Sequence, residues 1–502
     1  MLSDASLSDL HHHFTTGTLT ARALTVYYLE RIDQLDQHGP ALNAVIEINP
    51  DALEMADALD AELRERGPRG PLHGLPLLLK DNIDTGDRMQ TTAGSLALAG
   101  SRAARDAFLV RRLRAAGAVI LGKTNLSEWA NFRSSRSSSG WSSRGGQTHN
   151  AYVLDRNPSG SSSGSGVAVA AGLCAAAVGT ETDGSIVSPA QTNGIVGLKP
   201  TVGLLSRAGI IPIAHSQDTA GPMARSVADA ALLLGALTGV DPADPATAAS
   251  ADRSYTDYTQ FLTPDGLRGA RIGVARNYFG FDERVDALME AHVDTLRRLG
   301  AEVIDPANVP SPPEAREAEF LVLLYEFKDG LNRYLAALGS EVAVHSLAEV
   351  IDFNTRHAGR VLPYFGQETL VKAEGLGPLT SDEYLKALET SQRLARAEGL
   401  DAVLQAHRLD ALVAPTGGPA GLTDYVTGDH NSGGSSSAAA AAGYPSLTVP
   451  GGYVCGLPVG VSFIGAAYAE PKLLRLAYAF EQAVQLREPP RFLAHAEVGM
   501  TR

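Results

Sequence analysis

Short apolar runs of strand length alternate with helix-like segments along this chain of 502 residues. Runs such as Leu75 to Leu79 are too short for a helix and rich enough in leucine for a buried strand. Alternation of this kind predicts an α/β fold built in layers. We expect strands at 75–79, 117–122, 194–205, 271–275, 409–413 and 446–449, and helices from 21 and at 52–66, 106–116, 167–177 and 226–237.

Composition excludes several classes of partner and cofactor. A net charge of −14 argues against a nucleic-acid partner or an anionic membrane surface, because both need a basic face. No run of about 18 apolar residues occurs, so we expect no membrane span. The N-terminus lacks the pattern of a secretory signal, which predicts a cytoplasmic protein. Two cysteines and no His-Glu-x-x-His pattern predict no disulfide framework, no metal and no cofactor.

Lys80 closes the first apolar run and is a candidate base. It can take a proton only if its amine is neutral, which requires a pKa about 3 units below the usual value of about 10.4. Burial at the end of an apolar strand lowers a lysine pKa by this amount. The alternative, which the residues alone favour, is a charged Lys80 paired with Asp81 or Asp84.

Two serines in glycine-rich segments complete a possible catalytic set. Ser185 follows Asp183-Gly184, where a tight turn exposes the backbone N–H groups of Thr182 to Ser185. Such donors stabilise the oxyanion of a tetrahedral intermediate. Ser161 lies in a polar Gly/Ser loop, and its hydroxyl can both donate and accept a proton. Considered alone, the Ser185 segment is more often an ordinary Gly-Ser turn, and the Ser161 segment could equally be a flexible linker.

Two further patterns offer alternatives. Residues 117–124 match the Walker A pattern, but their spacer residues are apolar and form a strand themselves, which argues against a nucleotide site. Residues 160–164 match Gly-x-Ser-x-Gly, which would make Ser162 the nucleophile with His215, His345 or His430 as its partner. That motif requires a preceding hydrophobic strand, and residues 154–159 form a poor one.

Together these segments resemble the amidase signature family. The matching stretches are 74–82, 122–130, the Ser161 loop, the Ser185 loop and 197–201, with weaker matches at 410–416 and 456–460. The resemblance implies a large mixed β-sheet covered on both faces by helices. It also implies that Ser185 is the nucleophile, that Lys80 is the base, and that Ser161 relays the proton from a cis Gly160–Ser161 peptide bond.

Within that family the chain is most similar to bacterial peptide amidases, which remove the C-terminal carboxamide of peptides. The likeness rests on residues 126–133, 180–187, 217–226 and 323–328. It implies a small-molecule or short peptide amide as substrate. Alternatives are an aryl acylamidase, a carbamate or ester hydrolase, or an amidotransferase subunit, the last weakened because Val187 stands where many members carry arginine.

The resemblance also implies one amidase domain over residues 1–502, as a monomer or homodimer. We expect N-terminal helices at 1–65, the signature core at 66–235, a variable and mostly helical substrate region at 236–400, and the rest of the core at 401–502. The aromatic residues of the variable region suit either an apolar substrate wall or plain core. The candidate substrate contacts are Asn131, Tyr325, Phe327 and Phe365.

Overall fold

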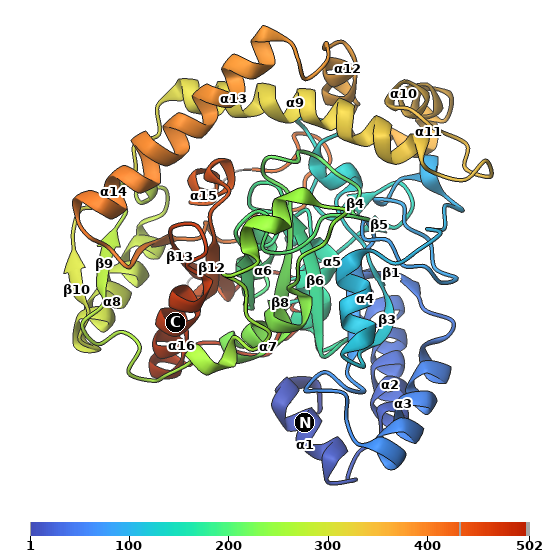
Figure 1. Ribbon diagram of the computed structural model, residues 1–502, viewed down its shortest axis with the longest axis horizontal. Coiled ribbons are helices and arrows are strands. Elements are labelled where there is room, and N and C mark those ends of the chain that lie inside the picture. Colours follow the sequence, from blue (N-terminus) through green and yellow to red (C-terminus); the bar gives the residue numbers. More distant parts are fainter. Residues whose placement is uncertain (1, 431–432, 498–502) are drawn as a thin grey trace.

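One large mixed sheet crosses the computed structural model, which describes residues 2–430 and 433–497 (Figure 1). Its strand order is β1-β3-β2-β6-β8-β7-β12-β13-β11-β9-β10, with parallel and antiparallel neighbours. The strands are β1 (Val45–Ile48), β2 (Pro76–Lys80), β3 (Val119–Thr124), β6 (Ala176–Glu181), β7 (Val196–Lys199), β8 (Thr219–Ala224), β9 (Arg271–Val274), β10 (Glu302–Ile304), β11 (Ala411–Pro415), β12 (Ser446–Val454) and β13 (Leu457–Ile464); β4 (Trp141–Ser142) pairs with β5 (Gly146–Gln147).

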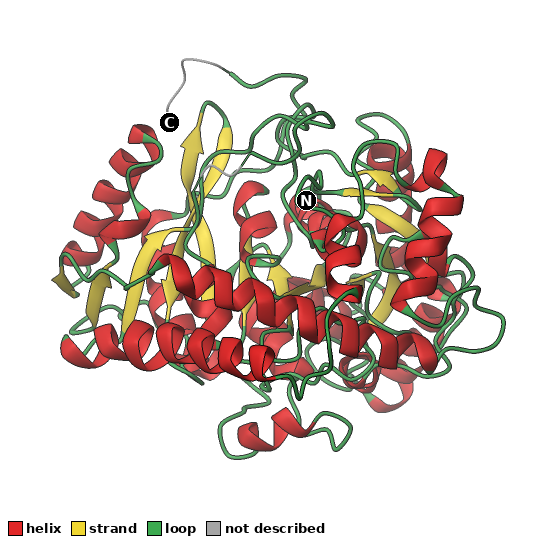
Figure 2. Ribbon diagram, turned by 90° about the horizontal axis from the view of Figure 1, so that it is seen from above, coloured by secondary structure: helices red, strands yellow, loops and turns green. Residues whose placement is uncertain are grey.

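Helices cover both faces of the sheet, as Figures 1 and 2 show, and this confirms the predicted fold class. On one face lie α2 (Ala21–Arg31), α3 (Ala52–Arg66), α4 (Phe108–Ala115), α7 (Val227–Leu237), α8 (Glu283–Arg298) and α16 (Glu470–Val484). The other face carries α5 (Ser163–Ala170) and α6 (Val187–Thr192), with α9 (Pro313–Ala336) and α13 (Asp382–Ala395) outside them. The remaining helices are α1 (Leu7–Thr15), α10 (Leu347–Arg356), α11 (Ala358–Val361), α12 (Glu368–Glu374), α14 (Asp401–Ala406) and α15 (Ser437–Ala442).

The central strands explain where the polar loops meet. β2 pairs in parallel with both β3 and β6, and the side chains of all three strands are buried. A strand covered on both faces needs an almost continuous apolar run, which is what Leu77 to Leu79 supplies. Because β2 and β6 are parallel neighbours, Lys80 and Thr180 emerge at the same edge of the sheet.

Some predicted elements were wrong. The predicted helix at 167–177 is instead α5, ending at Ala170, followed by β6 from Ala176. Gly172, at φ +65°, breaks the helix, and the small apolar residues around it suit either structure. The section 1–65 is not helical throughout, because β1 pairs with β3 at the sheet edge.

No helix in the described ranges 2–430 and 433–497 is long and apolar enough to span a membrane. The division into four sections stays a prediction, although strands from every section enter the same sheet.

Candidate active site

Lys80 ends β2 with its side chain fully buried. Its Nζ lies 2.7 Å from the Ser161 Oγ, 2.9 Å from the Thr180 Oγ1 and 3.2 Å from the Thr180 carbonyl oxygen. The Thr180 hydroxyl also accepts a hydrogen bond from the Asn82 Nδ2 at 3.0 Å. All three partners of the amine are therefore uncharged, and one of them is the predicted relay serine.

Burial lowers the pKa of Lys80 to about 7, against the nearby charges of Asp218 and Glu181, which raise it. The alternative pairing with an adjacent carboxylate is not found. Asp81 instead forms an ion pair with Arg144 at 3.1 Å. Asp84 accepts a hydrogen bond from the Tyr334 hydroxyl at 2.8 Å. With a pKa near 7, a substantial fraction of the Lys80 amine is neutral at neutral pH.

Ser161 is fully buried in the loop that leads into α5. The Gly160–Ser161 peptide bond is cis. The Ser161 carbonyl oxygen accepts a hydrogen bond from the Ser127 N–H at 3.2 Å. A Cβ on residue 160 would overlap the Ser127 Oγ, so only glycine fits there. The neighbouring backbone therefore holds the Ser161 hydroxyl against Lys80.

Ser185 lies in the turn between β6 and α6. Gly184 precedes it at φ +78°, a conformation that favours glycine. The Glu181 carboxylate accepts hydrogen bonds from the Ile186 N–H at 2.7 Å and the Val187 N–H at 3.0 Å, which fixes the far end of the turn. Ser185 itself accepts a hydrogen bond at its carbonyl oxygen from the Ser162 N–H at 3.2 Å. The turn is thus tied at both ends to buried partners.

The Ser185 hydroxyl makes no hydrogen bond within the described part of the chain. The structure therefore joins Lys80 to Ser161 directly and leaves the step from Ser161 to Ser185 open. Catalytic hydrogen bonds are often long or poorly aligned in the absence of substrate.

The backbone N–H groups of Thr182, Asp183, Gly184 and Ser185 donate to no acceptor among residues 2–430 and 433–497. Successive N–H groups that point into one concavity form an anion-binding nest. Most backbone donors in a folded protein are paired, so four unpaired neighbours mark a special site. These are the four residues that the sequence predicts for the oxyanion hole.

The alternative nucleophile, Ser162, is occupied. Its Oγ donates to the Thr180 carbonyl oxygen at 3.0 Å and accepts from the Thr180 N–H at 3.2 Å. None of its proposed histidine partners contacts it: His215 pairs with Glu326, His345 with a backbone carbonyl, and His430 with Asp424.

The segment that matches the Walker A pattern is a strand and not a phosphate-binding loop, because Val119 to Thr124 form β3. The Lys123 Nζ donates to the Ile83 carbonyl oxygen and the Thr91 hydroxyl.

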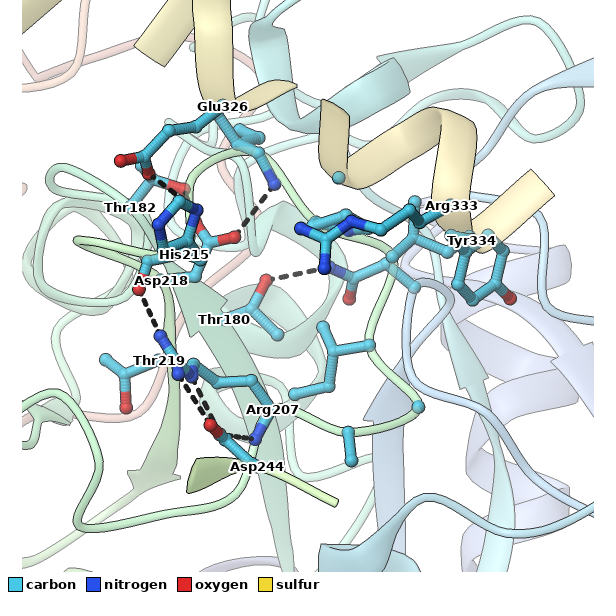
Figure 3. Close-up of a pocket in the computed structure, with 18 of the residues that line it drawn as sticks. Thr180, Thr182, Arg207, His215, Asp218, Thr219, Asp244, Glu326, Arg333 and Tyr334 are labelled. Carbon is cyan, nitrogen blue, oxygen red and sulfur yellow. Dashed lines mark hydrogen bonds and ion pairs between the residues drawn. The ribbon is translucent and has the colours of Figure 1, made fainter. Parts of the chain in front are cut away.

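Two cavities adjoin these loops. The larger, of about 990 Å³, is drawn in Figure 3. Its wall includes Asn82, Ala130, Ser161, Thr180, Thr182, Arg207, Ile211, His215, Asp218, Glu326, Arg333 and Tyr334. The smaller, of about 390 Å³, is lined by Gly160, Asp183, Gly184, Val187, Ser188, Arg316, Asp429 and His430, among others. The Ser161 and Ser185 loops thus contribute to the walls of both cavities.

The four candidate substrate contacts line neither cavity. Phe327 is fully buried against Phe132, and Tyr325 is buried with its hydroxyl donating to Glu383 at 2.5 Å. The ring of Phe365 packs on the Arg133 guanidinium, 4.1 Å from it. The Asn131 amide donates to the Ser139 hydroxyl at 2.9 Å. The three aromatic side chains are buried, which favours the alternative that they are plain core, and their role as substrate contacts stays a prediction.

Helix α9 supplies cavity residues that sequence reasoning missed. Arg316 lines the smaller cavity, whereas Glu326 and Arg333, farther along the helix, line the larger one. Asp218, just before β8, was also missed as a wall residue. Asp218 and Glu326 lie in the stretches that resemble peptide amidases, but a charged face on a helix usually indicates solvent exposure, so nothing in the sequence separated Arg316 and Arg333 from ordinary surface charges.

Comparisons with known proteins agree with the resemblance to amidases. A family model described as Amidase matches residues 23–474. The native peptide amidase of Stenotrophomonas maltophilia is 55% identical, with a TM-score of 0.93 over 97% of this chain and 99% of that one. A probable amidase of Arabidopsis thaliana is 44% identical over 98% of this chain and 92% of its own length. A glutamyl-tRNA(Gln) amidotransferase subunit of Halorhodospira halophila is 37% identical over 95% of this chain and 96% of its own length.

Proposed function

The chain belongs to the amidase family, and on that premise we propose that it hydrolyses the C-terminal carboxamide of peptides through an acyl-enzyme on Ser185. One observation carries the chemical part of the proposal. A buried lysine with a pKa of about 7 contacts a serine hydroxyl, beside a loop with four unpaired N–H groups that ends at a second serine.

The proposed reaction begins with neutral Lys80, which draws the proton of Ser161 while Ser161 draws that of Ser185. The Ser185 Oγ then forms a bond to the carbonyl carbon, and the oxygen becomes an oxyanion held by the N–H groups of residues 182–185. Each such donor is worth about 3 kcal/mol. The C–N bond breaks as Ser161 returns a proton to the leaving nitrogen, which departs as ammonia. Water then attacks the ester by the reverse route and frees the acid.

The peptide part of the proposal rests on likeness and on size. The likeness is to a peptide amidase that is 55% identical over nearly the full length of both chains. The larger cavity, at about 990 Å³, lies at the upper end of the range for small-molecule sites, roughly 300–1,000 Å³. Its wall mixes isoleucines with charged groups, which suits a peptide better than a purely aromatic ligand.

The test is covalent labelling of the nucleophile together with a comparison of substrates. We expect a fluorophosphonate to add one adduct mass to the wild-type chain, mapped to Ser185, and to leave Ser185→Ala unmodified. A peptide amide should be hydrolysed faster than an anilide, a carbamate or an ester at equal concentration. Labelling of another serine would contradict the mechanism, whereas faster anilide release would contradict only the substrate.

A related peptide amidase has been solved with the competitive inhibitor chymostatin, which provides a second probe. We expect chymostatin to compete with the peptide amide and to raise the Tm of this protein. A ligand at 100 times its Kd stabilises the folded state by about 2.7 kcal/mol. Absence of both effects would count against a peptide-binding site.

A second candidate function is that of an amidotransferase component, which the 37% identity to the Halorhodospira halophila protein favours. Such a component passes ammonia to a partner protein. Ammonia release from a peptide amide by the purified chain alone would exclude this candidate, and activity that appears only when a partner protein is added would support it.

A further inference from the structure

Thr182, at the start of the oxyanion loop, is held from two sides by the residues just before β8. Its hydroxyl donates to the Asp218 Oδ1 at 2.5 Å, and its carbonyl oxygen accepts from the Gln217 Nε2 at 3.4 Å. The other Asp218 oxygen accepts from the Ile213 N–H at 2.8 Å and the Ala214 N–H at 2.9 Å. One carboxylate therefore ties the loop to the wall of the larger cavity (Figure 3).

We propose that Asp218 is a positioning residue, whose carboxylate fixes the Thr182 end of the oxyanion loop and whose negative charge acts on Lys80. This inference rests on the proposed function, because it assigns a role in the same reaction. Asp218 belongs to neither of the serine loops. It acts on the N–H groups of residues 182–185 through Thr182 and on the Lys80 amine through its charge. It thus links the oxyanion loop to the proposed base.

The electrostatic half of the proposal depends on which charges face Lys80. Asp218 has the largest charge effect on the pKa of Lys80, and Glu181 at the end of β6 has the next largest. Both raise it. Burial raises the pKa of Asp218 itself to about 6, although its hydrogen bonds and the charge of Arg207 lower it. His215 and Glu326, whose Nδ1 and Oε2 lie 3.3 Å apart, line the same cavity. Asp218 is thus mostly ionised where Lys80 titrates.

Two substitutions separate the two halves. Asp218→Asn removes the charge and places an amide against two backbone N–H groups, so both effects should be lost. We expect kcat to fall roughly tenfold to a hundredfold, because the N–H groups of residues 182–185 would shift away from the oxyanion of the transition state. KM should change little, because these donors contact the oxyanion and not the bound substrate. The acid midpoint of kcat/KM should also move to lower pH, because Lys80 loses a neighbour that favours its charged form.

Thr182→Val removes only the hydroxyl that Asp218 holds and leaves the charge in place. We expect a lower kcat with the pH midpoint at its wild-type value, and Thr182→Ser should restore kcat because it keeps the hydroxyl. Thr182→Val and Thr182→Ser test the hydrogen bond between Thr182 and Asp218, which we call the clamp, even if Asp218→Asn fails to fold.

The matched control is Asp229→Asn, which changes another buried carboxylate, one that accepts from the Leu7 N–H at 2.8 Å far from the site. It should lower stability and leave kcat and the midpoint unchanged. An unmoved midpoint in Asp218→Asn would overturn the electrostatic role, and an unchanged kcat in Thr182→Val would overturn the clamp. Fluorophosphonate labelling of wild-type Ser185 must succeed first, because its failure would refute the proposed function. Normal labelling, with an unchanged kcat in Thr182→Val and an unmoved pH midpoint in Asp218→Asn, would refute only this inference.

Discussion

Three lysines are fully buried in the part of the chain that the structure describes, and their partners distinguish them. The Lys123 and Lys199 amines each donate to backbone carbonyl oxygens, with the Thr91 hydroxyl as a further partner of Lys123. Lys80 contacts the hydroxyls of Ser161 and Thr180. A carbonyl oxygen has no proton to give, whereas a serine hydroxyl does. Burial beside a hydroxyl does not by itself make a base, because Lys123 has both features; the hydroxyl partner of Lys80 differs because Ser161 lines the larger cavity.

Replacing each of two buried lysines by methionine separates catalysis from stability. Lys80→Met should lower kcat by about 10²–10⁴-fold, because it removes the base and leaves the chain of hydroxyls without an acceptor. Lys199→Met should leave the Tyr444 carbonyl oxygen unpaired, at a cost of about 1–3 kcal/mol, while the Ala439 carbonyl oxygen keeps its bond from the Tyr444 N–H, and kcat should stay near the wild-type value. Turnover of a peptide amide and urea unfolding of both variants provide the comparison. Equal kcat losses in the two variants would argue that Lys80 is merely structural.

The pH dependence follows from the pKa of about 7 of Lys80 in the folded protein. Only the neutral amine accepts a proton, so kcat/KM should rise with pH through about 7 and then level off. Stability changes in the same direction. The unfolded chain keeps this proton up to the ordinary pKa of 10.5, and the folded chain releases it near 7, so this group adds stability as pH rises between those values. A profile that falls through pH 7 would contradict this assignment.

At the scale of elements, the loop that carries Ser161 depends on glycine. Gly160→Ala would place a Cβ on the Ser127 Oγ, and the loop must shift to avoid it. A displacement of about 1 Å costs roughly a hundredfold in rate, so we expect kcat to fall by that amount while the protein still folds. The control is Gly359→Ala in α11, where a Cβ meets nothing within 4 Å. Wild-type kcat in Gly160→Ala would show that the loop tolerates movement.

Strands and helices were predictable where one sequence feature, an apolar run or a capping residue, was clear. Leucine runs predict β2, and the cap residue Thr20 predicts the start of α2. β8 was missed because Gly221 and Pro222 lie within it, and both residues usually argue against a strand interior. The end of α5 was missed because Gly172 looks like its neighbours in a run of small residues, and neither its φ of +65° nor the lack of room for a Cβ beside Ser3 can be read from the sequence.

At the scale of the whole molecule, Arg133 connects the outer helices to the core. Its guanidinium pairs with Glu128 at 2.8 Å, donates to the Val361 carbonyl oxygen at 2.8 Å, and packs against the rings of Trp141 and Phe365. The Arg133 and Glu128 side chains are both fully buried. The pair thus anchors the segment after α11 to the wall beside the site.

Arg133→Met should lower the free energy of unfolding by about 3–5 kcal/mol, because it leaves the Glu128 carboxylate buried without its cation. Arg133→Met with Glu128→Gln should recover part of that loss, since no unpaired charge remains. Urea unfolding of the wild type and both variants measures this. Equal stability of the single variant and the wild type would show that the pair contributes nothing to the docking of the outer helices.

The proposed catalytic set follows from sequence motifs, whereas the residues around it could not be predicted from them. Lys80, Ser161 and Ser185 lie in segments whose order and spacing carry the family resemblance. Thr182 and Asp218 meet only because β6 and β8 are antiparallel neighbours, which no local pattern indicates. The residues that α9 contributes to the two cavities could not be predicted either, because they depend on where this outer helix packs in the folded protein.

The most direct test of the central claim is the titration of Lys80 by NMR in protein carrying ¹³C-labelled lysine. The Lys80→Met variant would identify the Lys80 resonance by its disappearance. We expect a midpoint near pH 7 in the folded, active protein. A Lys80 amine that stays protonated to above pH 10 would contradict it, because the proposed base would then have no capacity to accept a proton at neutral pH.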